Sequence, residues 1–175
     1  MTASHKRLLR LVLYAMLGTL VFASKIAMES LPNIHPAAML LMAYTVVYRS
    51  HALIPLYVYV FLIGLFYGFN LWWYPYLYIW TVLWAVTVLL PKQISPRAAA
   101  IVYPLVCAVF GLAYGTLYAP AQAILFGYDF PTTVKWILAG LPYDLLHGIG
   151  NFFMGLLILP LSMLMKKLNR MIGLI

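Results

Sequence analysis

Residues 50–91 read SHALIPLYVYVFLIGLFYGFNLWWYPYLYIWTVLWAVTVLLP, and this stretch contains no Asp, Glu, Lys or Arg. A transmembrane helix needs about 20 consecutive apolar residues, so the stretch is long enough for two such helices. Asn70 and Pro75 interrupt it near the middle, where they favour a turn. The sequence therefore predicts a helical hairpin in the membrane, over residues 52–69 and 75–91.

The whole chain shares this apolar character. Of its 175 residues, 66% are hydrophobic and 8% are charged, and the mean hydropathy is +0.97. Soluble domains carry about 25% charged residues, so the composition excludes a water-soluble domain. The apolar runs are continuous, whereas the strands of a membrane β-barrel alternate apolar and polar residues. We therefore expect an all-α integral membrane protein that forms a single domain over residues 1–175.

Charged residues and prolines divide the chain into six predicted spans, at residues 8–28, 36–48, 52–69, 75–91, 98–119 and 132–166. Proline interrupts helical hydrogen bonding. We therefore expect Pro120 to end the fifth span, with a surface-lying segment after it, and Pro142 to kink the sixth span.

The Lys and Arg residues predict the orientation of this six-helix bundle. Cytoplasmic loops are enriched in Lys and Arg. With both termini in the cytoplasm, nine of the 11 basic residues lie on that side, and only Lys25 and Lys135 lie outside. This assignment also accounts for the net charge of +8, so we expect no nucleic-acid partner.

The sequence contains none of the common catalytic motifs. It has no phosphate-binding loop, no zinc-binding His-Glu helix motif and no nucleophile elbow. Its single cysteine, Cys107, lies in an apolar run and is expected to be a packed core residue. We therefore predict no catalytic residues, no metal site and no cofactor, and ATP hydrolysis would have to occur in another subunit.

Residues 141–151 read LPYDLLHGIGN and contain the most informative polar group of the chain. Asp144, His147 and Asn151 follow one another at helical spacing, so they share one face of the predicted helix. A carboxylate within a bilayer is costly and usually faces a cavity or the bundle interior, which favours a functional site. The alternatives are that these residues only hold helices together, or that Asp144 and His147 form the acid/base pair of a membrane enzyme.

Two predicted outer loops contribute further candidate residues. Trp and Tyr crowd the turn of the hairpin, where they suit either the membrane interface or stacking on a planar ligand. The first loop adds four polar side chains that would meet Asp144 if the loop folded over the bundle. The predicted substrate-binding residues are Lys25, Glu29, Asn33, His35, Asn70, Trp72, Trp73, Tyr76, Tyr143, Asp144, His147 and Asn151.

Small residues recur at every fourth position of the first span: Ala15, Thr19, Ala23 and Ala27. In a bilayer, such a ridge lets another helix approach closely. The ridge is expected to contact either the protein's own spans or another subunit.

Several stretches together resemble the substrate-binding S component of energy-coupling factor transporters, which are prokaryotic micronutrient importers. The resemblance rests on the six spans with both ends inside and on the sequences LPNIHPAAMLLM (31–42), LIGLFYG (62–68), AGLPYDLLHGIGNF (139–152) and KKL (166–168). It implies a multi-pass protein of the prokaryotic plasma membrane. It also implies that the small-residue ridge docks on a transmembrane coupling subunit powered by two ATPase subunits.

The leading hypothesis is thus a membrane subunit that binds a small water-soluble micronutrient, such as a vitamin or its precursor, for an ATP-driven module. The alternatives are an integral-membrane enzyme that uses Asp144 and His147, and an accessory subunit without a ligand.

Overall fold

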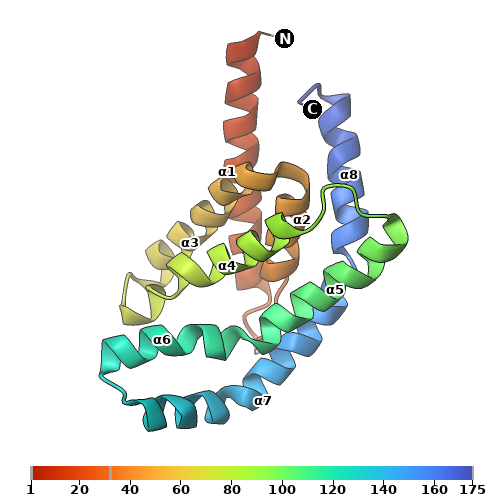
Figure 1. Ribbon diagram of the computed structural model, residues 1–175. Coiled ribbons are helices and arrows are strands. Elements are labelled where there is room, and N and C mark those ends of the chain that lie inside the picture. The colour runs from red at the N-terminus through yellow and green to blue at the C-terminus, as the bar shows by residue number, and fades with distance from the viewer. Residues whose placement is uncertain (1, 32, 175) are drawn as a thin grey trace.

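The computed structural model describes residues 2–31 and 33–174, and these residues form helices without a β-strand (Figure 1). The prediction of an all-α protein is confirmed. In chain order the elements are α1 (Ala3–Ala27), α2 (Ala37–Tyr48), η1 (Arg49–Ala52), α3 (Leu53–Tyr67), η2 (Leu71–Trp73), α4 (Tyr76–Leu89), α5 (Pro96–Leu112), α6 (Tyr114–Phe126), α7 (Phe130–Gly155) and α8 (Ile158–Met171).

Three helical stretches of the described chain are long and apolar enough to cross a membrane: Ala3–Ala27, Ala37–Tyr67 and Pro96–Phe126. The pair α7 and α8, bent by 44°, forms a fourth if it counts as one span. The predicted hairpin corresponds to α3 and α4, which contain 15 and 14 residues and are each shorter than the roughly 20 residues of a full span. The described residues therefore contain three or four helical segments that could span a membrane.

The α2 helix lies at the centre of the molecule. Its sequence, AAMLLMAYTVVY, is apolar on every side, which is typical of a helix surrounded by others. Every residue from Ala37 to Thr45 is buried, and α2 contacts α1, α4, α7 and α8. The core around it includes the fully buried rings of Tyr44, Tyr59 and Trp80.

Glycines bring α5 and α7 close together. A Cβ atom on Gly111 would lie 2.7 Å from the backbone oxygen of His147, and one on Gly155 would lie 2.7 Å from the Cα atom of Pro104. Only glycine permits such an approach, because both neighbouring atoms belong to backbone that cannot rotate away. The face of α7 that carries the predicted polar residues therefore packs closely against α5.

Gly111→Ala is expected to destabilise the protein by about 2 kcal/mol, since the added methyl group forces α5 away from α7. Gly140→Ala is the matched control, because its Cβ atom would meet nothing within 4 Å. Thermal unfolding in detergent should show a lower melting temperature for the first variant alone. Equal melting temperatures would contradict the close packing of α5 on α7.

Two of the breaks along the second half of the chain differ from those predicted, whereas α7 changes direction as expected for a helix that contains Pro142. The fifth span is interrupted at Ala113 and not at Pro120, which lies inside α6. Pro142 lies inside α7, which changes direction along its length in Figure 1. A further break separates α7 from α8, where Pro160 occupies the first turn of α8, a position that tolerates proline.

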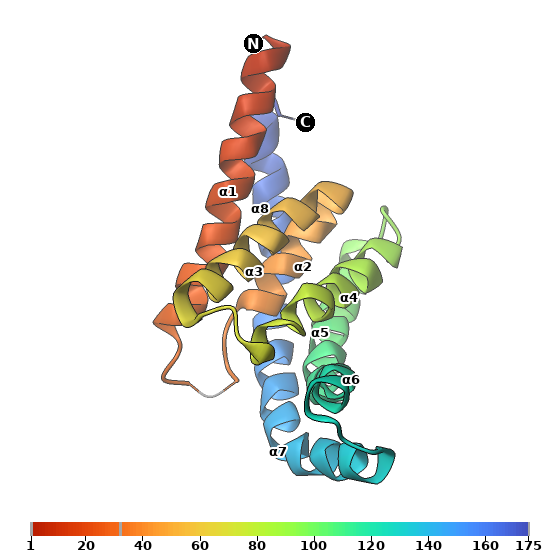
Figure 2. The same ribbon diagram turned by 90° about the vertical axis from the view of Figure 1, so that its left-hand side faces the viewer.

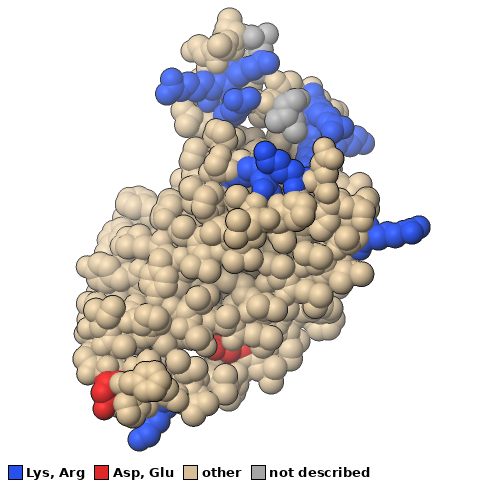
Figure 3. Space-filling model, viewed as in Figure 1, with Lys and Arg blue, Asp and Glu red and all other residues tan. Residues whose placement is uncertain are grey.

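Most basic residues lie at the opposite end of the molecule from the acidic residues. Figures 1 and 2 both place the two termini at the same end of the molecule, with α6 and the start of α7 at the other end. In Figure 3, Lys and Arg gather mainly around the terminal end, and the visible Asp and Glu lie towards the opposite end.

Candidate functional site

A cavity of about 370 Å³ lies between α6 and the first half of α7, at the end opposite the termini. We call it the α6–α7 cavity. Asp144 and His147 line it, and their side chains are only 6% and 4% exposed. The remaining walls are mostly aromatic or small, with Asn33, Tyr114, Gly115, Tyr118, Gln122, Trp136, Gly140 and Tyr143.

Asp144 joins α7 to the start of α6. The backbone N–H of Gly115 donates to both carboxylate oxygens of Asp144, at 3.0 and 3.1 Å. The first N–H groups of a helix have no partner within the helix, so this carboxylate compensates for the break at Ala113. A Cβ atom on Gly115 would lie 2.5 Å from Oδ2 of Asp144, which leaves room only for glycine. Asp144 therefore holds two helices together and also faces a cavity.

The first loop folds over α7, and His35 meets His147 there. The ring centroids of the two histidines are 5.5 Å apart, and the ring of Tyr114 lies 4.9 Å from His147 on its other side. The side-chain amide of Asn33 donates to the carbonyl of Tyr143 at 3.5 Å. Burial, followed by the neighbouring His147 and Lys25, lowers the pKa of His35 to about 3, so this loop histidine is neutral at physiological pH.

A second cavity, of about 310 Å³, lies beside α3 and α4, and we call it the α3–α4 cavity. The hydroxyl of Tyr67 donates to Oε1 of Glu29 at 2.6 Å, and Nζ of Lys25 lies 4.9 Å from the centroid of the Tyr67 ring. Trp72 and Tyr76 form another wall, with their ring centroids 5.7 Å apart. This cavity thus combines one base, one acid and three aromatic rings.

Aromatic rings link the two cavities. Trp80 lies between Tyr76 of the α3–α4 cavity and Tyr114 of the α6–α7 cavity, with its ring centroid 6.0 Å from each. The hydroxyl of Tyr118 also donates to the carbonyl of Trp72 at 2.6 Å. The two cavities therefore belong to one aromatic region at the same end of the protein.

Several buried polar atoms of the protein interior lack a hydrogen-bond partner among the described residues. They are His35 Nδ1, Tyr44 Oη, Tyr59 Oη, Trp80 Nε1, His147 Nε2 and Asn151 Nδ2. A buried polar group without a partner costs about 1–3 kcal/mol, so such groups are rare unless they serve a function. The ring centroids of Trp80 and Tyr59 are 5.5 Å apart, so the unpaired atoms of these two residues lie within the aromatic region.

The structure distributes the predicted binding residues over both cavities. Asn33, Tyr143, Asp144 and His147 line one cavity, and Lys25, Glu29, Trp72 and Tyr76 line the other. His35 contacts His147 from the loop.

Besides His35, three predicted residues lie outside both cavities. Nε1 of Trp73 donates to the carbonyl of Val60 at 2.9 Å, which fixes its ring against α3. Asn151 is buried, with its amide close to the position that a Cβ atom on Gly111 would take. Asn70 is exposed and precedes η2.

Sequence analysis did not single out five aromatic residues of this region: Tyr59, Trp80, Tyr114, Tyr118 and Trp136. The sequence did offer a signal for these residues, because a Tyr hydroxyl or Trp N–H within an apolar span needs a hydrogen-bond partner. Groups of three or more His, Cys, Asp and Glu that could hold a metal ion are absent from the described part of the chain.

The small-residue ridge faces outward. Ala15, Thr19, Ala23 and Ala27 are all exposed, whereas α1 packs on α3 through Gly18, whose Cβ atom would lie 2.6 Å from the carbonyl of Pro55. A shallow apolar groove follows the ridge and includes Ala15, Thr19 and Ala23. Within the described residues, the ridge is therefore free of contact with the protein's own long spans.

In comparisons with known proteins, the chain matches no family model, no curated protein and no solved structure.

Proposed function

We propose that this chain is a membrane subunit that binds a small, water-soluble, aromatic micronutrient, such as a vitamin or its precursor. The observation that carries the proposal is a set of buried polar atoms without partners, on His147, His35, Tyr59 and Trp80, in or beside the two aromatic cavities. A ligand with ring and polar atoms would satisfy both features, because aromatic walls stack on it and precisely placed polar groups orient it. Among the described residues that line the α6–α7 cavity, Asp144 alone is charged, so the ligand presents a hydrogen-bond donor or a positive charge there.

The proposed topology has six spans, with both termini in the cytoplasm of a prokaryotic cell. Both termini share one end, and most basic residues lie near it, which agrees with the enrichment of Lys and Arg in cytoplasmic segments. The cavities then open towards the outer side, where an aqueous micronutrient is encountered. The short helices α2, α3 and α4 would cross only part of the bilayer each, supported by the longer helices around them.

The chain would transport its ligand only together with an ATP-driven module, as its resemblance to S components implies. The exposed ridge of α1 supports this proposal, because small residues at every fourth position suit close contact with another transmembrane helix. The expected partners are a transmembrane coupling subunit and two ATPase subunits.

Tryptophan fluorescence provides the test, since Trp72 and Trp136 line the two cavities. The purified chain should show saturable quenching with one member of a panel of water-soluble vitamins and their ring precursors. Trp136→Phe should reduce the quenching, whereas Trp84→Phe should preserve it, because Trp84 instead donates to the carbonyl of Arg49 at 3.0 Å. Absence of saturable quenching across the panel would count against the proposal.

A further inference from the structure

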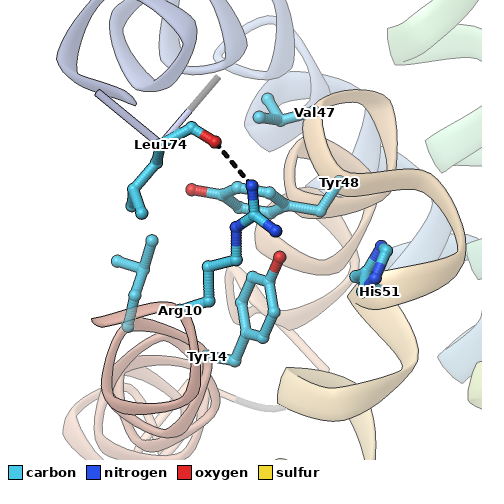
Figure 4. A pocket seen from close by; sticks show the side chains of 7 residues that line it. Arg10, Tyr14, Val47, Tyr48, His51 and Leu174 are labelled. Carbon is cyan, nitrogen blue, oxygen red and sulfur yellow. Dashed lines mark hydrogen bonds between the residues drawn. The ribbon is translucent and has the colours of Figure 1, made fainter. Parts of the chain in front are cut away.

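A third cavity, of about 180 Å³, lies at the end of the molecule that carries both termini (Figure 4). We call it the terminal cavity. Arg10 and Tyr14 of α1 form one side, Tyr48 and His51 form another, and Leu174 closes it from the C-terminal segment. None of these residues contributes to the proposed micronutrient site.

The polar groups of the terminal cavity converge on one place. The guanidinium group of Arg10 donates one N–H to the carbonyl of Leu174 at 2.9 Å. A guanidinium has five N–H donors, so others remain for a ligand. Figure 4 shows the Tyr14 hydroxyl directed towards this guanidinium, with the Tyr48 ring behind it. The Tyr14 side chain is 6% exposed, and its ring packs edge-on against Tyr48 with the centroids 5.2 Å apart. The cavity is therefore built from packed side chains that present donors.

The surroundings of the cavity are strongly basic. Lys6 and Arg7 precede Arg10 on α1, and Lys166, Lys167 and Arg170 lie along the last turns of α8. The three acids of the chain, Glu29, Asp129 and Asp144, follow α1, precede α7 and lie within α7, and none of them lines the terminal cavity. The ligand that complements this cavity is consequently an anion.

The location of the cavity indicates the source of that anion. Large apolar side chains on the exposed face of α1 flank it within one turn, namely Leu8 and Leu11. Such a surface is suited to acyl chains, and a basic pocket beside it is suited to a lipid headgroup. A guanidinium binds phosphate oxygens through charge-assisted hydrogen bonds, and tyrosine hydroxyls add donors. We propose that the terminal cavity binds the phosphate group of an anionic phospholipid.

Native mass spectrometry of the full chain in detergent tests this proposal. The probes are phosphatidylglycerol and phosphatidylcholine with identical acyl chains, mixed in equal amounts. Both lipids carry a phosphate that Arg10 can bind, but the choline cation of phosphatidylcholine is repelled by this guanidinium and the basic residues around it, so the wild-type chain should retain phosphatidylglycerol about tenfold better. Arg10→Gln should abolish this preference, whereas Arg7→Gln, which removes the same charge from the same helix outside the cavity, should preserve it.

Tyr14→Phe provides a second variant, since it retains the ring packing and removes only the hydroxyl. It should reduce the retained amount of phosphatidylglycerol about threefold, in line with the loss of one hydrogen bond to the phosphate. Equal retention of both lipids by the wild type would overturn the proposal, as would equal losses in Arg10→Gln and Arg7→Gln. Displacement of phosphatidylglycerol by inorganic phosphate in millimolar excess would assign the site to a soluble phosphate and overturn the lipid assignment.

Discussion

His147→Phe is expected to weaken ligand binding about a hundredfold and at the same time to stabilise the ligand-free protein. Nε2 of His147 is buried and has no hydrogen-bond partner among the described residues, although the side chain lines the α6–α7 cavity. Phenylalanine keeps an aromatic ring next to Tyr114 and His35 and removes this nitrogen. Removal of an unpaired buried polar atom should stabilise the ligand-free state by about 1 kcal/mol.

Opposite changes in the two quantities distinguish a binding residue from a structural one. Binding is measured by tryptophan quenching with the panel compound that the wild type binds, and stability by the melting temperature without that compound. His5→Phe is the control, because His5 is exposed and lines none of the three cavities. If His147→Phe lowered the melting temperature and left affinity unchanged, the histidine would be a structural group only.

Replacements of Asp144 are expected to separate its role in holding α6 to α7 from its role in binding the ligand. Asp144→Ala removes the acceptor for the Gly115 N–H and should cost about 2 kcal/mol of stability, in addition to most of the ligand affinity. Asp144→Asn retains a side-chain oxygen that accepts this bond, so its melting temperature should stay close to that of the wild type. Its affinity should still fall about tenfold, because a bound donor or cation loses a charged partner.

Asp129→Asn is the matched control for charge. Asp129 caps α7 by accepting the Thr132 N–H at 2.9 Å, and asparagine serves this role equally well. It lines neither of the two micronutrient cavities, so its replacement should leave affinity and stability unchanged. An Asp144→Ala variant with wild-type stability would contradict the capping role, and unchanged affinity in Asp144→Asn would contradict contact between the carboxylate and the ligand.

The helical class of the protein could be predicted because it depends on local properties. Continuous apolar runs in a bilayer favour helices over other structures, because a helix pairs its backbone groups internally. The break at Ala113 could not be predicted, because Asp144, which accepts the N–H of Gly115 just after the break, lies 29 residues beyond that glycine. Pro120 carried the stronger local signal, yet it is accommodated within α6. Pro160 did carry a usable local signal for the break between α7 and α8.

The candidate site was predictable only where its residues share one helix or one loop. Helical spacing alone placed Asp144 and His147 on the same face. The contributions of Tyr59 and Trp80 depend on how α3 and α4 pack, which the sequence does not specify. Trp73 was predicted to bind the ligand because it lies in a loop, but its Nε1 donates a hydrogen bond to the carbonyl of Val60.

The central claim is that the interior of this membrane protein binds a small aromatic nutrient. Mass spectrometry of the compounds released when the purified chain is denatured tests it most directly. The wild type should release about one equivalent of a single water-soluble ring compound, consistent with one linked aromatic site of this size. His147→Phe, purified in parallel, should release almost none. Absence of such a compound from the wild type, or equal amounts from both proteins, would contradict the account.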